Sequence, residues 1–259
     1  MGRLSAIAVH PIKSLDRHDR DRVTITPTGG LSGDRTYAIV DEAGEFVNGK
    51  RTAAVHRLRA ILDPEQNRLE LRVEGERSAE TFHVEDDRQA LNEWLSSYFG
   101  YSVTLDRRDG PELTDIPDPG PTVIARATLE TAAGWFPGID ADELADRLRP
   151  NLIVDGVETF WADRLVPDGR VRIGDAVIEG SRPVPRCVVP SRDPRTGEVY
   201  DGFRETFIRE RKELFPDWAD ATAFETYFSL MTATHAPEAA RGADLAVGDR
   251  VELVDGSAH

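Results

Sequence analysis

Cys187 is the only cysteine in this chain of 259 residues, and its surroundings suit a reactive thiol. It directly follows Arg186, in a segment with prolines at positions 183, 185, 190 and 194. A neighbouring cation favours the thiolate form of cysteine, and thiolate is a soft ligand for a soft metal ion. The thiolate could equally be a nucleophile, although no histidine lies nearby in the sequence, and a buried structural thiol is a third interpretation. A single cysteine excludes an intramolecular disulfide, a Cys-rich zinc site and an iron–sulfur cluster held by this chain alone.

Lys13 and Ser14 follow a short apolar run and a proline near the start of the chain. Lysine offers a compact charge and serine a hydroxyl, a pair that suits a phosphate group. Lys13 is one of only three lysines, whereas the chain contains 29 arginines. The alternative is an ordinary surface lysine after a strand.

Arg35 and Arg149 also lie beside turns. Arg35 follows a segment with glycines at positions 29, 30 and 33, which allow a positive φ and a close approach of the backbone. The glycine spacing is wrong for a dinucleotide site, and an Asp34–Arg35 ion pair in a plain connection is the alternative. Arg149 and Asn151 flank a proline, so a guanidinium for phosphate and an amide for a heterocycle edge would be held in place.

The elements that position these residues are mostly strands in the first hundred residues. Alternation predicts strands over 23–25, 36–40 and 69–73, with hairpins through 41–45 and back to 82–84. A helix is expected over about 87–99, capped by Asp86 or Asp87, because its apolar residues fall on one stripe.

The second half mixes helices and strands. Thr128 is expected to cap a short helix through Trp135, and Asp140 with Glu143 forms a capping box for a helix that Pro150 ends. We then expect a strand over 152–154 and a helix over 203–214. Phe203, Phe207 and Leu214 of this helix should point inward. Two similar segments, 173–177 and 247–251, each place Gly-Asp between strand residues and predict similar hairpin or bulge turns.

Residues 107–121 contain four prolines and two glycines and predict a linker between two domains. We place the domains at 1–115 and 116–259. The longest stretches without a charged residue span 12 residues, too few for a transmembrane helix of roughly 18. The N-terminus shows no secretory pattern, so a cytoplasmic protein is expected.

The charge balance is strongly acidic, with 47 Asp and Glu against 32 Lys and Arg and a net charge of −15. Phosphate contacts need the opposite sign, so neither nucleic acid nor an anionic membrane is an expected partner. The six histidines show no pair at helical spacing, which argues against a metal site built from histidines. An acid-rich, lysine-poor composition resembles that of halophile proteins, and we expect a high-salt cytoplasm.

The motifs, in their order along the chain, resemble the MOSC family, named after the C-terminal domain of molybdenum cofactor sulfurase. The resemblance covers about residues 3–255 and is greatest for members with an added N-terminal β-barrel domain, such as the mitochondrial amidoxime-reducing component. The matching motifs are His10-Pro11-Ile12-Lys13-Ser14, Gly33-Asp34-Arg35, Thr128-Leu129, Arg149-Pro150-Asn151, Ile173-Gly174-Asp175, Arg186-Cys187 and Asp193-Pro194-x-Thr196-Gly197. We therefore expect a β-rich α+β fold of two packed, barrel-like antiparallel β domains with peripheral helices.

The resemblance implies a pyranopterin–molybdenum cofactor in a cleft between the two halves. Cys187 matches the family's cysteine ligand to molybdenum and would be the catalytic residue. The expected cofactor-binding residues are Lys13, Ser14, Arg35, Thr128, Arg149, Asn151 and Arg186. This chain departs from the family at three positions. Pro185 replaces a small hydroxyl residue two positions before the cysteine, and only Asp163 is present of the usual acidic pair after the Arg-Pro-Asn strand. His10 stands where relatives often have an aromatic residue.

The function implied by this resemblance is an oxidoreductase that reduces small N-hydroxylated substrates such as amidoximes. Electrons would come from a separate ferredoxin- or cytochrome-type protein, because the chain has neither an iron–sulfur motif nor a dinucleotide fingerprint. Two alternatives are a non-catalytic carrier of the molybdenum cofactor or of sulfur, and a structural module without a cofactor. Pyridoxal phosphate is not expected, since in the sulfurases it belongs to a separate domain.

Overall fold

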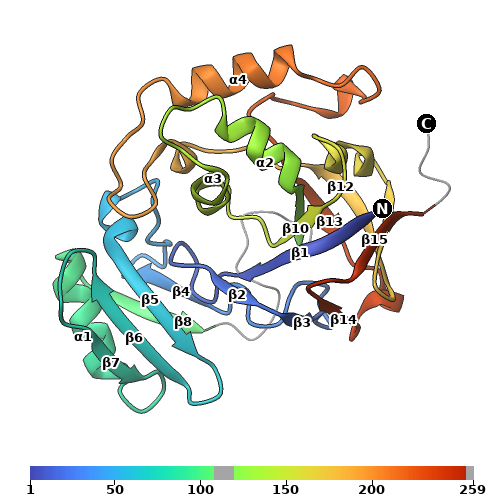
Figure 1. Cartoon of the computed structure of the whole chain (residues 1–259). Coiled ribbons are helices and arrows are strands. Elements are labelled where there is room, and N and C mark those ends of the chain that lie inside the picture. The colour runs from blue at the N-terminus through green and yellow to red at the C-terminus, as the bar shows by residue number, and fades with distance from the viewer. Residues whose placement is uncertain (108–119, 255–259) are drawn as a thin grey trace.

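A closed β-barrel forms the centre of the computed structural model, which describes residues 1–107 and 120–254 (Figure 1). The described chain closes seven strands into a ring, in which β9 and β10 pair in parallel and the other neighbours are antiparallel. A short strand, β2 (His18–Arg20), pairs with β1 outside the ring. The ring runs through β1 (Gly2–Val9), β10 (Leu152–Asp155), β9 (Thr122–Ala125), β13 (Thr232–His235), β12 (Ala176–Pro183), β11 (Arg170–Ile173) and β15 (Arg250–Leu253).

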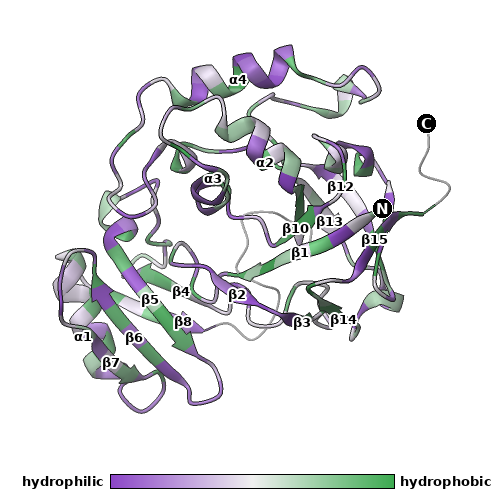
Figure 2. Ribbon diagram, in the orientation of Figure 1, coloured by the Kyte–Doolittle hydropathy of each residue, from purple (hydrophilic) through white to green (hydrophobic). Residues whose placement is uncertain are grey.

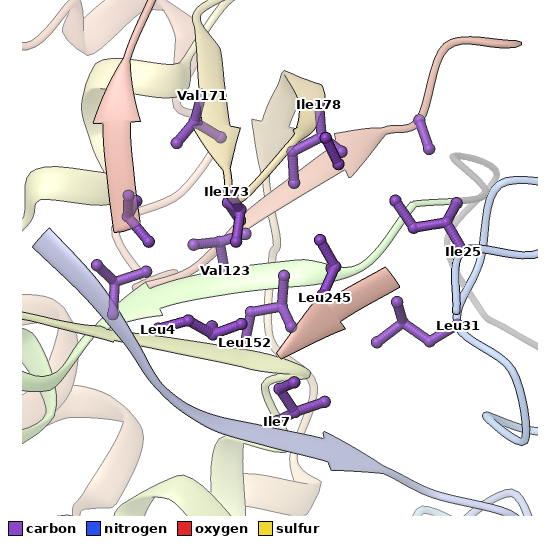
Figure 3. Packing of buried hydrophobic residues seen from close by; sticks show 14 of the residues in the cluster. Leu4, Ile7, Ile25, Leu31, Val123, Leu152, Val171, Ile173, Ile178 and Leu245 are labelled. Atoms are coloured by element: carbon purple, nitrogen blue, oxygen red, sulfur yellow. The ribbon is translucent and has the colours of Figure 1, made fainter. Parts of the chain in front are cut away.

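Aliphatic side chains fill the barrel interior, where residues of β1, β9, β10, β11 and β12 point toward one another (Figure 3). In β9 and β10 the residues alternate between the two faces, as strand geometry requires. Val123 and Leu152 point inward, whereas Ile124 and Ile153 belong to a second apolar cluster outside the ring. Burial on both faces explains why residues 123–125 and 152–154 are continuously apolar.

Three helices cover the outer face of the barrel: α2 (Arg126–Ala133), α3 (Ala141–Leu148) and α4 (Phe203–Glu213). Their apolar sides join Ile124 and Ile153 in the second cluster. Its aromatic centre includes Phe136 and Phe203, whose rings stack with centroids 4.3 Å apart. In Figure 1, α2 and α4 lie on the side of the barrel away from the sheet of β5, β6 and β7.

The rest of the N-terminal half has its own core between two small sheets and one helix. The sheets are β4 (Tyr37–Asp41) with β8 (Val103–Arg107), and β5 (Leu58–Asp63) with β6 (Arg68–Val73) and β7 (Glu80–His83); the helix is α1 (Arg88–Phe99). Along β5 and β6, buried residues alternate with more exposed ones, and Figure 2 shows hydrophilic and hydrophobic residues alternating along β6. Leu69 and Leu91 are among its fully buried residues.

The two halves share strands. β1 comes from the first residues of the chain, yet it closes the barrel by pairing with β10 and β15. In addition, β3 (Arg22–Thr24) pairs with β14 (Asp244–Ala246) near the other end of the chain. The barrel is therefore incomplete without the N-terminal strand. The predicted linker and the division at 115/116 fall mainly on residues 108–119, outside the described residues, so the division stays a prediction.

The fold class, the helices near 88–99, 141–148 and 203–213, and the hairpin at 173–176 are confirmed. Asp140 accepts a hydrogen bond from the Glu143 N–H at 2.8 Å, but the Glu143 carboxylate binds Arg147 instead of completing the capping box. Asp87 is the N-cap residue of α1, as predicted, but its carboxylate accepts from the His83 N–H and makes no capping hydrogen bond to the helix.

Three local predictions are wrong. Thr128 does not cap a helix, because α2 begins at Arg126 directly after β9. Leu214 does not point inward: it ends α4 and is 44% exposed. Gly248 and Asp249 join β14 to β15, which belong to different sheets, so this segment is a corner between sheets and no hairpin.

Candidate functional site

A cleft of about 970 Å³ runs between the barrel and the N-terminal half. One wall comes from the loop after β1 and from residues 48–62, and the other from the end of α3 and the loop after β12. The described residues that line it include twelve Lys and Arg but only four Asp. In a chain of net charge −15, this cleft concentrates positive charge where a ligand would enter.

Lys13 and Ser14 form part of the first wall. The Lys13 N–H donates to the Tyr37 carbonyl at 2.8 Å, which fixes the backbone of the loop against β4. The Lys13 ammonium lies 4.7 Å from the centroid of the Phe46 ring. Ser14 has a φ of 73°, a left-handed conformation that turns the chain along the wall.

Asp34 organises the floor of the cleft. Its carboxylate accepts from the His10 N–H at 2.7 Å and from the Asn151 amide at 3.2 Å, and it pairs with Arg35. Burial raises the pKa of Asp34, but the charge of Arg35 and the bond from His10 outweigh this effect and hold the pKa well below its usual value. Burial, and next the charge of Arg149, lower the pKa of His10 to about 3, so its imidazole is neutral.

Asn151 lines the cleft, but its amide is already engaged within the protein. Its oxygen accepts from the Thr122 N–H and hydroxyl, both at 3.1 Å, and its nitrogen also donates to the Ala8 carbonyl at 3.1 Å. Asn151 therefore holds β1, β9 and Asp34 together. A direct contact with a heterocycle, as predicted, would have to compete with these bonds.

Arg149 lies at the end of α3, where Pro150 prevents the helix from continuing. It takes a left-handed conformation with a φ of 58° and donates from Nη1 to the Leu15 carbonyl at 2.7 Å across the cleft. Burial, and next the charge of Arg35, lower its pKa to about 9, so it is still a cation at pH 7. Among the described residues, no Asp or Glu forms an ion pair with Arg149.

Cys187 is half-buried and lines the cleft from the loop between β12 and the short 3₁₀ helix Val189–Ser191. The Arg186 N–H donates to the Phe228 carbonyl at 2.9 Å immediately before it. After it, Arg147 of α3 donates to the Pro190 carbonyl at 3.1 Å from a buried guanidinium. The thiol is thus held between two backbone anchors.

Arg59 of β5 connects the two walls. Its Nη1 lies 3.0 Å from Asp16 Oδ1, in the loop that carries Lys13 and Ser14. Its Nη2 donates to the Pro194 carbonyl at 3.2 Å, in the loop that carries Cys187. One guanidinium therefore fixes the separation of the predicted anion-binding residues and the predicted thiolate.

The structure brings seven of the eight predicted site residues to one cleft: Lys13, Ser14, Arg35, Arg149, Asn151, Arg186 and Cys187. Thr128 is not among the described lining residues; it is fully buried in α2, and its hydroxyl accepts from the Phe160 N–H at 2.7 Å. The sequence analysis missed His56, Arg59, Arg147 and Arg192, which also line the cleft. Two of them had a local signal: Arg192 belongs to the arginine cluster around Cys187, and Arg147 has i,i+4 spacing from Glu143.

Within the part of the chain that the structure describes, no group of three or more His, Cys, Asp or Glu side chains is arranged to hold a metal ion. A metal ion bound by Cys187 would need further ligands from a cofactor. The described helices include none that is long and apolar enough to cross a bilayer.

Two family profiles match this chain. The MOSC N-terminal beta barrel domain matches residues 1–102, and the MOSC domain matches residues 123–252. Among solved structures, the YuaD protein from Bacillus subtilis is similar over 98% of this chain and 96% of its own, with 9% identity and a TM-score of 0.36, a likeness too weak to carry an argument. The comparison with curated proteins gives no match.

Proposed function

Because this chain belongs to the MOSC family, whose domains are associated with molybdenum cofactor binding, we propose that the cleft binds this cofactor and that the protein is an oxidoreductase. Its substrates would be small N-hydroxylated compounds, and a separate protein would supply electrons. The mitochondrial amidoxime-reducing component, which the sequence resembles, is the basis for this substrate class.

The observation that carries the proposal is the position of Cys187. The only thiol of the chain lines a cleft rich in arginine, on a loop anchored at both sides. A structural thiol would be expected in an apolar core, yet Cys187 belongs to none of the three apolar clusters.

The residues of the cleft fit the cofactor. A pterin phosphate needs cations and backbone turns, and Lys13, Arg35 and Arg149 lie at such turns. In addition, the buried Nε of Arg192 has no hydrogen-bond partner among the described residues. A soft metal centre needs a thiolate, and Cys187 is the residue that provides it. The pair of loops joined by Arg59 would hold both ends of one ligand.

The bound cofactor would supply the two-electron redox chemistry of the reaction. The protein residues would orient it: Cys187 would bind the metal, and Arg149 and Lys13 would bind the phosphate. Neutral His10 would offer a hydrogen bond from the floor without adding charge. Asp34 keeps Arg35 in place, because its carboxylate stays ionised.

Turnover with an artificial reductant tests the proposal. Protein purified from a host that makes molybdenum cofactor should reduce benzamidoxime with dithionite-reduced viologen, and it should not oxidise NADH by itself. Cys187→Ser is the matched control and should lose this turnover. Molybdenum-loaded protein that reduces no N-hydroxylated compound, but passes its cofactor to an apoenzyme, would contradict the reductase proposal in favour of a carrier.

A further inference from the structure

Arg192 differs from several arginines of the cleft because it has no acidic partner among the described residues. It is half-buried and lies five residues after Cys187. Its Nη1 donates to the Gly197 carbonyl at 3.1 Å, but its Nε is buried with no hydrogen-bond partner in the described structure. Other cleft arginines are matched by carboxylates, in the pairs Arg17–Asp146, Arg59–Asp16 and Arg147–Glu143.

His56 lies in the same part of the cleft. It is only 9% exposed, and its Nε2 has no hydrogen-bond partner among the described residues. Burial, and next the charges of Arg192, Arg149 and Arg59, lower the pKa of His56 to about 4, while the nearby Asp193 has the opposite effect. The imidazole is therefore neutral at pH 7 and retains one N–H to donate.

The space beside His56 depends on Gly49. A Cβ atom at position 49 would lie 2.5 Å from the Nε2 of His56 and 3.4 Å from a methyl group of Val189. Any other residue would therefore push the imidazole or the loop of Cys187. The glycine allows the first wall to approach the loop that carries both Cys187 and Arg192.

A guanidinium that is half-buried without an acidic partner, and whose Nε is buried without a hydrogen-bond partner in the described structure, is costly to a fold unless something else supplies an acceptor and negative charge. We propose that Arg192 and His56 form an oxyanion subsite beside the Cys187 loop, which receives a phosphate or carboxylate group. The guanidinium would provide the charge, and the neutral imidazole would add a hydrogen bond. Two sources have this chemistry: the cofactor's own phosphate, or an acidic group of the substrate. The choice between them rests on the proposed function, whereas the subsite itself does not.

Titration of His56 tests the subsite in cofactor-free protein. A bound oxyanion stabilises the imidazolium, so inorganic phosphate should raise the pKa of His56, followed by NMR of its ring C–H signals. Arg192→Gln should weaken phosphate binding by at least about tenfold, because a hydrogen bond to a charged group is lost, and Arg192→Lys should restore part of it. Arg57→Gln is the matched control: Arg57 is exposed, adjacent to His56 and bonded to the Glu74 carbonyl.

Phosphate that leaves the His56 signals unchanged, or that binds Arg192→Gln as tightly as the wild type, would overturn the proposal. These readouts need neither cofactor nor turnover, so a failure of the reductase proposal would not be confused with a failure of the subsite.

Measurements on cofactor-loaded protein distinguish the two sources of the oxyanion. If Arg192→Gln loses most of its molybdenum, the subsite binds the cofactor's phosphate. If molybdenum is retained while KM rises at least about tenfold for 4-carboxybenzamidoxime but not for benzamidoxime, the subsite binds an acidic substrate. Wild-type values for both molybdenum content and KM would show that the subsite has no role, and the proposal would fall.

Discussion

Two regions of this protein bury arginine in opposite ways. Arg211 of α4 is fully buried beneath aromatic rings, 4.2 Å from the centroid of Phe160 and 4.8 Å from that of Phe215. Its Nη2 pairs with the buried carboxylate of Asp163, and its Nε donates to the Ser229 carbonyl at 3.3 Å. This charge is matched within the protein and joins α4 to the segment after β10.

Two arginines of the cleft, Arg149 and Arg192, are not matched in this way. Arg149 and Arg192 donate to the backbone carbonyls of Leu15 and Gly197, but among the described residues neither has an acidic partner. Burial makes an unmatched charge costly, so the two regions differ in what supplies the opposite charge. The charge of Arg211 is matched inside the fold, whereas the unmatched charges of the cleft suit the anionic ligand that we propose.

Removing the acid from the matched pair should have the largest effect. Asp163→Ala leaves Arg211 buried without a carboxylate and should lower the free energy of unfolding by about 3–5 kcal/mol. Urea unfolding measures this change. The double variant Asp163→Leu/Arg211→Met should recover most of the loss, because it removes both charges; a loss below about 1 kcal/mol in Asp163→Ala would show that the pair is not a matched buried charge.

The same pair should respond to pH. Burial raises the pKa of Asp163 to about 6, although Arg211 opposes the effect. Between about pH 4 and pH 6 the folded state therefore binds more protons at Asp163 than the unfolded state, and the stabilisation from this group, at most roughly 3 kcal/mol, falls as pH rises. The difference in unfolding free energy between wild type and Asp163→Asn should fall over this window. A difference that is constant or increases would contradict the assignment.

Replacing the unmatched Arg149 should affect cofactor binding more than stability. In cofactor-free protein, Arg149→Gln loses a hydrogen bond to Leu15 but also relieves repulsion from Arg35, so the free energy of unfolding should change by less than about 1.5 kcal/mol. Molybdenum content should nevertheless fall sharply, as measured by mass spectrometry of protein from a cofactor-making host. A strongly destabilised variant with its metal retained would make Arg149 a structural residue like Arg211.

Salt should have opposite effects on the acidic exterior, which affects stability, and on the basic cleft, which binds phosphate. Raising KCl shortens the Debye length from about 10 Å at 0.1 M to about 3 Å at 1 M. The chain's excess of 15 negative charges then repels itself less, so the melting temperature should rise by a few degrees. Phosphate binding in the cleft should weaken over the same range. Parallel changes in the two quantities would contradict the contrast between exterior and cleft.

Local sequence was enough to predict residues whose surroundings are local. Pro150 ends α3 and so places Arg149 at a turn, and the prolines around Cys187 give an irregular loop, both visible in the sequence. Long-range partners could not be predicted in this way. His56 and Arg192 are separated by 136 residues and come together only because the 3₁₀ helix Ala53–Arg57, before β5, and the loop after β12 meet at the cleft.

The barrel shows the same limit. The strand pattern of β1 was visible, but its pairing with β10 and β15 depends on residues some 150 and 250 positions away. Thr128 was misplaced because a hydroxyl that bonds the distant Phe160 N–H resembles a helix cap in the sequence. Residue types thus predicted which side chains suit an anion or a metal ion, and tertiary contacts determined which of them line one cleft.

The most direct test of the account is the molybdenum content of the wild type and of Cys187→Ala, both purified from a host that makes the cofactor. The account predicts molybdenum close to one per chain in the wild type and almost none in the variant. The cofactor-free forms should melt within a few degrees of each other, since roughly 1 kcal/mol changes the melting temperature of a chain of this size by about 2–4 °C. A Cys187→Ala protein that retains its full molybdenum would contradict the assignment of this thiol as the metal ligand.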